Sequence, residues 1–600
     1  MSDTDSSWRL RPVILALVGA LAALLVQQLA DHDYGVTIAP WRSSLAVAIG
    51  TAALAVGLAL ERVRVAWTLA FAALAGATAG LVHHWSGGGG GFWFGDWRYL
   101  SLAIALGIAV PLFQVARDEG KAVFPYAAVH GHAWTNALLW LAAWVFTGVV
   151  FLLGWLLSAL FQLIGLRFLR DLLGEGWFAA LLAGAALGGA LGLLRERDRV
   201  VRLLQSVATA VLGVLAPVLA VGLVVFLLAL PFTGLAVLWN TRAATATLLS
   251  AAAGALLLAN AVIGDGPDDE SRNPALRWAA TALAACVLPI SLLAAVATGL
   301  RLDQYGSTPE RLWALVFVAI SCAYGLAYLV ALVRGRAAWA PLARQGNLRL
   351  AFGVAAVALV LATPLVSFNA IATNAQVARL KAGRVSPDRF DWAALQFDFG
   401  ASGKAAVAAL GRSPDSRIAA RATEAGRSTN RYDVAEKTRL ATAAEKLATR
   451  LTILPRSVPL PPALTQALAG YDTCERINAN GCLLFYETGA SEAFSLDQSC
   501  LTPRPGRRGN AEPAWLSCTV IRLVRNDGAV DAEARMTTSV GTSRIAKGAW
   551  RIEHLGDLGD TNDAAGVTQR AAVRSRRIEV RPVERRQVVI GGVPVGGVFD

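Results

Sequence analysis

Charge is scarce in this chain of 600 residues, where Asp, Glu, Lys and Arg together make up 16%. A soluble protein of this length carries about a quarter charged residues. Hydrophobic residues account for 55%, and the mean hydropathy is +0.50. The apolar residues gather into runs of about 18 or more, long enough to cross a hydrocarbon layer as helices. These features exclude an ordinary soluble protein and indicate one that resides in a lipid bilayer.

Several motifs that carry chemistry are also missing. The sequence contains no nucleophile elbow, no Cys/His zinc pattern and no nucleotide-binding fingerprint. We therefore assign no catalytic residue, no cofactor and no metal. The net charge of +13 is not accompanied by an RNA- or DNA-binding motif, so we assign it to loop arginines and anionic headgroups rather than to nucleic acid.

Hydropathy predicts about eleven transmembrane helices. The predicted spans are Pro12–Ala30, Ser43–Leu60, Val65–Val82, Tyr99–Val115, Ala137–Leu160, Trp177–Leu194, Val207–Leu230, Ala243–Ile263, Trp278–Leu300, Leu312–Val333 and Leu350–Phe368. A short polar break, Arg301–Arg311, precedes the span that begins at Leu312. Within it, Ser307, Thr308 and Pro309 indicate a helix start, with a capping hydroxyl and a proline in the first turn.

Loop arginines and lysines predict the orientation. With the N-terminus inside, sixteen Lys and Arg residues fall in inner loops and seven in outer loops. This distribution obeys the positive-inside rule, and an odd number of spans places everything after Phe368 outside. We expect a bacterial inner membrane with a cytoplasmic N-terminus and a periplasmic C-terminal domain.

The composition changes after Phe368. A helix over Ile371–Leu380 is expected to stop at Gly383, and another over Arg389–Phe399 has Phe390, Trp392, Leu395 and Phe399 as its apolar face. Further helices are expected up to about residue 470, and short strands follow from about Leu483. The predicted organisation is a polytopic α-helical membrane domain (1–368), a helical membrane-proximal segment (369–470) and a small β-rich domain (471–600). The C-terminal soluble part is thus α+β and β-rich at its end.

Two stretches resemble a bacterial family of multi-pass membrane proteins, domain of unknown function 4153. The first is Gln304-Tyr305-Gly306-Ser307-Thr308-Pro309-Glu310-Arg311-Leu312-Trp313-Ala314-Leu315. The second runs from Asn374-Ala375-Gln376-Val377-Ala378-Arg379-Leu380 through Ser386-Pro387-Asp388-Arg389-Phe390-Asp391-Trp392 to Phe397-Asp398-Phe399-Gly400. The resemblance implies a polytopic bacterial membrane protein and brings no activity with it.

The predicted spans have no ionisable residue away from their ends, which weighs against a proton-coupled transporter or pump. One cluster of ionisable side chains that could bind a ligand or take part in catalysis is expected at the outer face; it comprises Asp31, His32, Asp33, His83, His84 and Asp96. One interpretation is a metal site, because imidazole and carboxylate groups are common metal ligands. Another is an active site, because the chain resembles membrane glycosyltransferases that use lipid-linked sugars in having acidic residues in its first outer loop. Simple interfacial solvation is the interpretation that we favour over both.

Four of the six cysteines fall in the β-rich domain: Cys474, Cys482, Cys500 and Cys518. An even number in one small domain is typical of an oxidising compartment and predicts two disulfides. Three pairings are possible, and we prefer Cys474–Cys482 and Cys500–Cys518 because each closes a short loop. The spacing is too wide for the paired C-x-x-C knuckles of a zinc site.

These observations favour a non-catalytic role in binding, sensing or scaffolding at the cell envelope. The alternatives are a membrane enzyme that acts on a lipid-linked substrate at the outer face, and a transporter. The expected partner is the lipid bilayer, and the sequence identifies no protein partner. Arginines crowd the C-terminal strands, so an anionic lipid or envelope polymer is a further candidate partner, although a solvated pair of strands is the interpretation that we favour. Those arginines are Arg570, Arg574, Arg576, Arg577, Arg581, Arg585 and Arg586.

Overall fold

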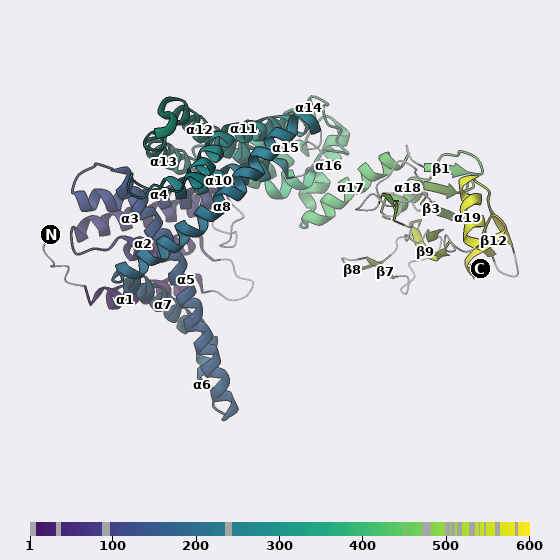
Figure 1. Ribbon diagram of the computed structural model, residues 1–600. Helices are drawn as coiled ribbons and strands as arrows, with labels where there is room; N and C mark the ends of the chain where they lie inside the picture. The colour runs from purple at the N-terminus through teal and green to yellow at the C-terminus, as the bar shows by residue number, and fades with distance from the viewer. Residues whose placement is uncertain are drawn as a thin grey trace. The chain divides into compact units, whose positions relative to one another are not determined.

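The computed structural model divides the chain into two units, residues 1–372 and residues 373–600. We call them the membrane unit and the tail unit and describe each by itself (Figure 1). The structure describes residues 8–31, 38–86, 97–234, 243–448, 451–470, 482–497, 504–505, 511–512, 519–526, 535–538, 541–544, 548–558, 564–582 and 586–599.

The membrane unit is built from long apolar helices. Within the described residues, eleven helices are long and apolar enough to span a membrane, which confirms the predicted polytopic fold. The helices are α1 (Arg11–Ala30), α2 (Pro40–Ala59), α3 (Val65–Trp85), α4 (Trp97–Glu119), α5 (Tyr126–Leu163), α6 (Phe168–Gly174), α7 (Gly176–Arg195), α8 (Asp198–Thr233), α10 (Ala244–Ile263), α11 (Pro274–Tyr305), α12 (Pro309–Gly335), η1 (Arg336–Ala338) and α13 (Ala340–Ala362). All but the short α6 and η1 are spanning helices.

Several helices extend beyond their apolar runs. α5 begins at Tyr126 rather than at the expected Ala137, and α11 ends at Tyr305 rather than Leu300. α13 differs most, because it covers Ala340–Ala362 where Leu350–Phe368 was expected. Its first ten residues include Arg344, Gln345, Asn347 and Arg349, which lower the hydropathy, whereas arginine and glutamine are good helix formers. At its other end, Pro364 cannot continue the helix.

Small residues let the helices of the membrane unit approach closely. Gly184, Gly188 and Gly192 recur every four residues along α7 and face α1. A Cβ atom at Gly188 would collide with the carbonyl of Leu15, and one at Gly184 with the carbonyl of Gly19. This is the small-xxx-small packing of membrane helices, in which backbones touch directly. The main core of the unit lies elsewhere, among α8, α10, α11, α12 and α13.

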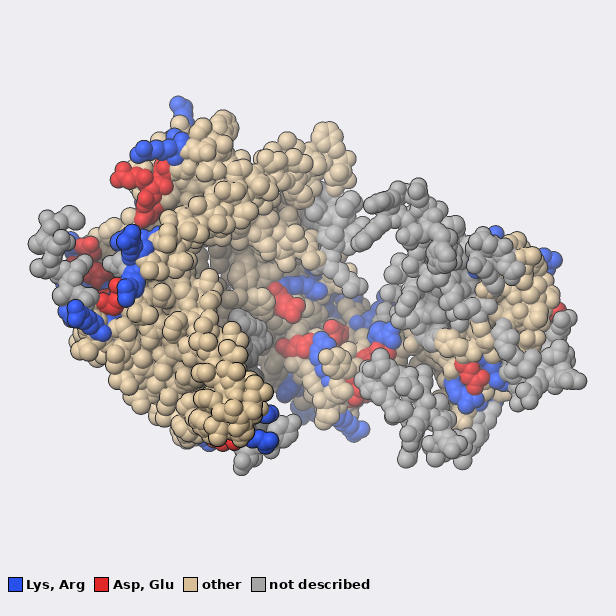
Figure 2. Space-filling view, turned by 60° about the horizontal axis from the view of Figure 1, so that its bottom comes forward, with Lys and Arg blue, Asp and Glu red and all other residues tan. Residues whose placement is uncertain are grey.

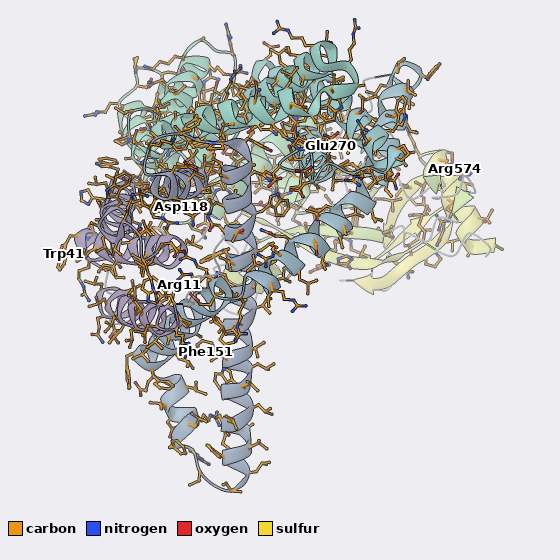
Figure 3. All side chains as sticks on the ribbon, turned by 60° about the vertical axis from the view of Figure 1, so that its left-hand side comes forward. Arg11, Trp41, Asp118, Phe151, Glu270 and Arg574 are labelled. Atoms are coloured by element: carbon orange, nitrogen blue, oxygen red, sulfur yellow. The ribbon has the colours of Figure 1, made fainter. Side chains whose placement is uncertain are left out.

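Apolar side chains also cover the outside of the membrane unit, as lipid contact requires. Figure 2 shows a broad tan expanse over this unit, with charged side chains gathered at its border. Trp41, at the start of α2, is 62% exposed and points away from the helices (Figure 3). The far half of α5, which carries Phe151, projects from the other helices together with α6 (Figures 1 and 3).

The tail unit begins with helices. They are α14 (Phe368–Lys381), which starts within the membrane unit, the π-helical turn η2 (Ala394–Asp398), α15 (Gly400–Leu410), α16 (Ser416–Arg427), α17 (Arg431–Ala448) and α18 (Pro462–Gly470). α14 ends as expected near Gly383, which has a φ of +68°. The expected helix over Arg389–Phe399 is replaced by turns and η2, but its four apolar residues are each at most 3% exposed.

Most of the strands follow these helices, and within the described residues of the tail unit they form four small sheets. The strands are β1 (Leu451–Leu454), β2 (Cys482–Phe485), β3 (Glu492–Asp497), β4 (Arg504–Pro505), β5 (Ala511–Glu512), β6 (Thr519–Arg525), β7 (Arg535–Thr538), β8 (Gly541–Arg544), β9 (Trp550–Asp557), β10 (Ile578–Pro582), β11 (Arg586–Ile590) and β12 (Val593–Phe599). The largest sheet has the order β1-β2-β3-β6-β9, in which only β1 and β2 are parallel.

Both faces of the largest sheet are covered. Successive side chains of a strand point to opposite faces, and apolar residues occur on both. Leu484, Ile521 and Leu523 pack with residues of α18 on one face. Leu483 and Val520 pack on the other face with α19 (Ala564–Arg574) and with the β10-β11-β12 sheet. The tail unit is therefore a soluble α+β fold with its own core.

The helix α19 corrects one expectation about the arginines near the C-terminus. Arg570 and Arg574 lie on this helix rather than on strands, and Arg570 is only 8% exposed. Arg576 and Arg577 follow it, and both are exposed, as is Arg574 (labelled in Figure 3). Arg586 forms an ion pair with Glu492 at 2.5 Å. Part of the basic run is thus structural. Arg574, Arg576 and Arg577 carry its exposed charge among the described side chains, which do not include those of Arg581 and Arg585.

Candidate functional site

The predicted outer-face cluster is described only in part, since His32, Asp33 and Asp96 lie outside the described residues. Asp31 follows the end of α1, and its backbone carbonyl accepts a hydrogen bond from Arg42 at 3.1 Å. His83 is buried and hydrogen-bonds through Nδ1 to the hydroxyl of Tyr99 at 2.6 Å, whereas His84 is exposed. The two adjacent imidazoles therefore do not share an environment. No group of three or more potential metal ligands occurs among the described residues.

The first family-like motif is the turn between α11 and α12. Thr308 is the N-cap of α12 and accepts a hydrogen bond from the backbone N–H of Arg311 at 3.4 Å, and Pro309 occupies the first turn. Arg311 donates to the carbonyl of Gly306 at 2.7 Å. The helix start expected from the sequence is confirmed.

Trp313 of the same motif joins an aromatic group at this end of the membrane unit. Its ring stacks with Trp97 of α4 at 5.8 Å between centroids and meets Phe368 of α14 edge-on at 4.9 Å. Tryptophans at helix ends mark the headgroup level of a bilayer. The motif therefore ties α4, α12 and the start of α14 together at the membrane interface.

The second motif holds the helices of the tail unit by two acid–arginine pairs. Asp388 accepts from Arg421 of α16 at 2.8 Å, and Asp398 accepts from Arg431 of α17 at 2.7 Å. The Trp392 indole donates to the carbonyl of Pro387 at 2.8 Å. A hollow in the surface here is lined by Asp388, Trp392, Arg421, Glu424, Ser428 and Asp433. These contacts are structural, because each charge in the two pairs has its counter-charge within the fold.

The opposite end of the membrane unit, where α1 begins, holds polar groups that the sequence did not reveal as a cluster. The last carbonyls of α2 accept hydrogen bonds from side chains of other helices. Gly57 accepts from Arg195 at 3.0 Å, Leu58 from Gln114 at 2.8 Å, and Ala59 from Arg117. These side chains satisfy the carbonyl groups that a helix C-terminus leaves unpaired.

Glu61, just after α2, completes this arrangement. Its two carboxylate oxygens pair separately, one with Arg11 of α1 and the other with Arg195 of α7, the latter at 2.6 Å. Both arginine side chains are 9% exposed. Arg11 is labelled in Figure 3. We call Arg11, Glu61, Arg117 and Arg195 the arginine network.

A second group at the same end lies among α5, α10, α12 and α13. Asn260 donates to the hydroxyl of Tyr328 at 2.8 Å, and Asn347 donates to the side-chain oxygen of Asn260 at 2.7 Å. Asn347 also approaches the hydroxyl of Tyr126 at 3.4 Å. Tyr328 is fully buried, so this amide–phenol chain runs from a half-buried tyrosine into the interior of the helices.

Arg344 connects this chain to the loop after α10. It donates to the carbonyls of Ile263, Gly264 and Gly266 and pairs at 3.4 Å with Glu270, which is labelled in Figure 3. In the same loop, partial burial and the neighbouring carboxyl of Asp269 raise the pKa of Asp265 to about 6, against the opposing charge of Arg344. The amide–phenol chain, which reaches the buried Tyr328, forms the candidate site together with this loop.

Chemically, this site offers amide and phenol groups that donate and accept hydrogen bonds, and a loop carboxyl, Asp265, that can exchange a proton. The sequence signals for it were Asn260 and the polar start of α13, but each was separated from its partners by scores of residues. Only the packing of four helices brings them together.

The class that these features define is a polytopic membrane protein with a separate soluble unit. The chain belongs to the DUF4153 family, a domain of unknown function, whose model matches residues 13–411. The match includes the membrane unit from residue 13 onward, both motifs and α15, and it ends before the sheets of the tail unit. No curated protein and no solved structure matches the chain.

Proposed function

We propose that this protein is a non-catalytic binding, sensing or scaffold component of a bacterial cell envelope. The observation that carries the proposal is the joining of two different units in one chain. Eleven apolar helices supply a membrane anchor with polar groups paired at one end, and a soluble α+β unit with its own covered sheet follows. Such a soluble unit, held at a membrane, suits recognition of an envelope component.

The proposed location is the inner membrane, with the N-terminus in the cytoplasm and the tail unit in the periplasm. Two independent arguments support this orientation. Sixteen loop Lys and Arg residues lie on the proposed cytoplasmic side against seven on the other, and an odd number of spans then carries the tail unit across. The four tail cysteines are the second argument, because paired thiols require an oxidising compartment.

The proposed disulfides are Cys474–Cys482 and Cys500–Cys518. Among the described cysteines, the free thiols are Cys286 and Cys322 of the membrane unit, and Cys482 is not one of them. Cys482 is 1% exposed at the start of β2, a position that shields a disulfide from reductants. Cys474, Cys500 and Cys518 lie outside the described residues.

The proposed organisation has three parts: a membrane domain to residue 368, a membrane-proximal helical segment to 470 and a β-rich domain to 600. The helices α14 to α18 precede nearly all of the strands, which supports a change of architecture near 470. β1, which pairs with β2, makes the two soluble parts continuous.

Deletion of the gene followed by complementation tests the proposed role. Envelope integrity and the lipid profile are measured with the full chain and with a chain that lacks residues 412–600. We expect the envelope defect to persist with the shortened chain while the lipid profile stays normal. An altered lipid profile that only the full chain corrects would indicate an enzyme instead.

One observation favours a second candidate, a membrane enzyme that acts on a lipid-linked substrate at the outer face. The buried His83–Tyr99 pair lies at the same end of the helices as Asp31. Replacing Asp31 and Asp33 together by Ala separates the two candidates. If complementation survives this double change, the enzyme is excluded; if it is lost while the protein is still inserted, the non-catalytic role fails.

A further inference from the structure

α14 is the first helix after the last span, and its start is fixed at the membrane interface. α13 ends at Ala362, and only five residues separate it from Phe368, the first residue of α14. Phe368 packs against Trp313, which in turn stacks with Trp97 at the first residue of α4. Since tryptophans at span ends lie at headgroup level, α14 starts there too.

One face of α14 is exposed from Ile371 to the end of the helix. The exposed residues Ile371, Asn374, Ala378 and Lys381 recur every three or four positions and therefore form a single stripe. The other face is buried, with Ala372 at 0% and Leu380 at 3% exposure. The helix thus has one side fixed to the protein and one side open.

The composition of the exposed stripe changes from apolar to basic. Leu365, just before the helix, is 79% exposed, and Ile371 is 46% exposed. Lys381 and Arg384 are exposed at the other end, and neither pairs with a described carboxylate. Exposed aliphatic residues next to a bilayer insert among acyl chains, and nearby cations attract anionic headgroups.

We propose that α14 is an interfacial helix that lies on the bilayer and binds anionic phospholipid through Lys381 and Arg384. Its occupant is lipid of the same bilayer, because the helix continues directly from the last span and its charge is complementary to phosphate. Leu365 and Ile371 supply the apolar contact, and the two cations select the headgroup. The inference holds whichever side of the membrane the tail unit occupies, so its failure would leave the proposed function untouched.

The test uses the full chain in lipid nanodiscs that contain equal amounts of phosphatidylglycerol and phosphatidylcholine. The photo-crosslinker p-benzoylphenylalanine replaces Ile371, and captured lipid is identified by mass spectrometry. The same crosslinker at Tyr432, which is 74% exposed on α17, gives the background. We expect lipid adducts at position 371 with phosphatidylglycerol enriched roughly two-fold or more.

Charge variants then test the headgroup selection. The double variant Lys381→Gln/Arg384→Gln should keep the adduct but lose the enrichment. The matched variant Lys404→Gln/Arg412→Gln removes the same charge from exposed positions on and after α15 and should leave the enrichment intact. Absence of lipid adducts at position 371 would overturn the proposal, as would an enrichment that both variants lower equally. All four positions are exposed, so unchanged thermal unfolding serves as the check on folding.

Discussion

At the scale of single residues, the arginine network shows how a membrane protein keeps charge where lipid is near. Each buried guanidinium is matched to carbonyls or to a carboxylate, so little desolvation cost is left uncompensated. Hydropathy could locate Arg11 and Arg195 at span ends, because charge interrupts apolar runs. It could not show that Glu61 joins them, since the contact depends on the crossing of α1, α2 and α7.

Glu61→Gln is predicted to destabilise the membrane unit. The neutral amide leaves Arg11 and Arg195 in a buried position with weaker partners. Removing one member of a buried pair costs roughly 3–5 kcal/mol, and the partial exposure of Glu61 reduces this to roughly 2 kcal/mol. Thermal unfolding in detergent measures the loss.

Glu119→Gln is the matched control for this change, because it makes the same chemical substitution at an exposed carboxylate at the end of α4. Its melting temperature should equal that of the unchanged protein. Equal melting temperatures for both variants would contradict a stabilising role for Glu61.

Asp265 makes the stability of the α10–α11 loop depend on pH. Its pKa is raised to about 6 by burial and by the nearby Asp269, so the folded state holds the proton more tightly than the unfolded chain does. The protein should therefore gain stability as the pH falls from 7 towards 5. When the pH is raised again through about 6, Asp265 ionises and this added stability is lost.

Asp269→Asn removes the neighbouring negative charge that helps to raise this pKa. We expect the gain of stability on acidification to shrink in this variant, as followed by thermal unfolding at several pH values. Asp268→Asn, at an exposed neighbour, is the control and should keep the original profile. The assignment to Asp265 is wrong if the two variants behave alike.

At the scale of elements, close helix packing depends on glycines at particular positions. Gly188→Ala should destabilise the α1–α7 pair, because the new methyl group collides with the Leu15 carbonyl. Overpacking of this kind costs roughly 1–3 kcal/mol. Gly148→Ala in α5 is the control, because a Cβ there meets nothing within 4 Å. Unfolding in detergent should rank the two variants in that order, and the reverse ranking would refute the packing argument.

Sequence patterns predicted which helices exist better than where those helices end. The existence of the spans followed from hydropathy alone, because the bilayer requires about twenty apolar residues in a row. Their ends did not, because residues such as Tyr126 and Arg344 continue a helix while facing polar neighbours. The expected apolar face of Phe390, Trp392, Leu395 and Phe399 is buried as predicted. The spacing of these four residues along the sequence could not distinguish an α-helix from a π-helical turn. The candidate site was missed for the same reason as Glu61, since Asn260 and Asn347 meet only through packing.

At the scale of the whole molecule, the disulfide proposal predicts the reactivity of all six cysteines. The denatured, unreduced protein should react at two thiols, Cys286 and Cys322, and at four more after reduction. Each disulfide would restrict the unfolded tail and thereby raise its free energy of unfolding by roughly 2–3 kcal/mol. Mass spectrometry after alkylation counts the labels, and six labels without reductant would rule the disulfides out.

The orientation of the two ends is the claim on which the proposed role depends most. Protease added to intact spheroplasts tests it directly, with one epitope tag at the N-terminus and another after Asp600. The account predicts that the C-terminal tag is digested at once, whereas the N-terminal tag survives until the membrane is lysed. A C-terminal tag that is protected until lysis would place the tail unit in the cytoplasm and contradict the account.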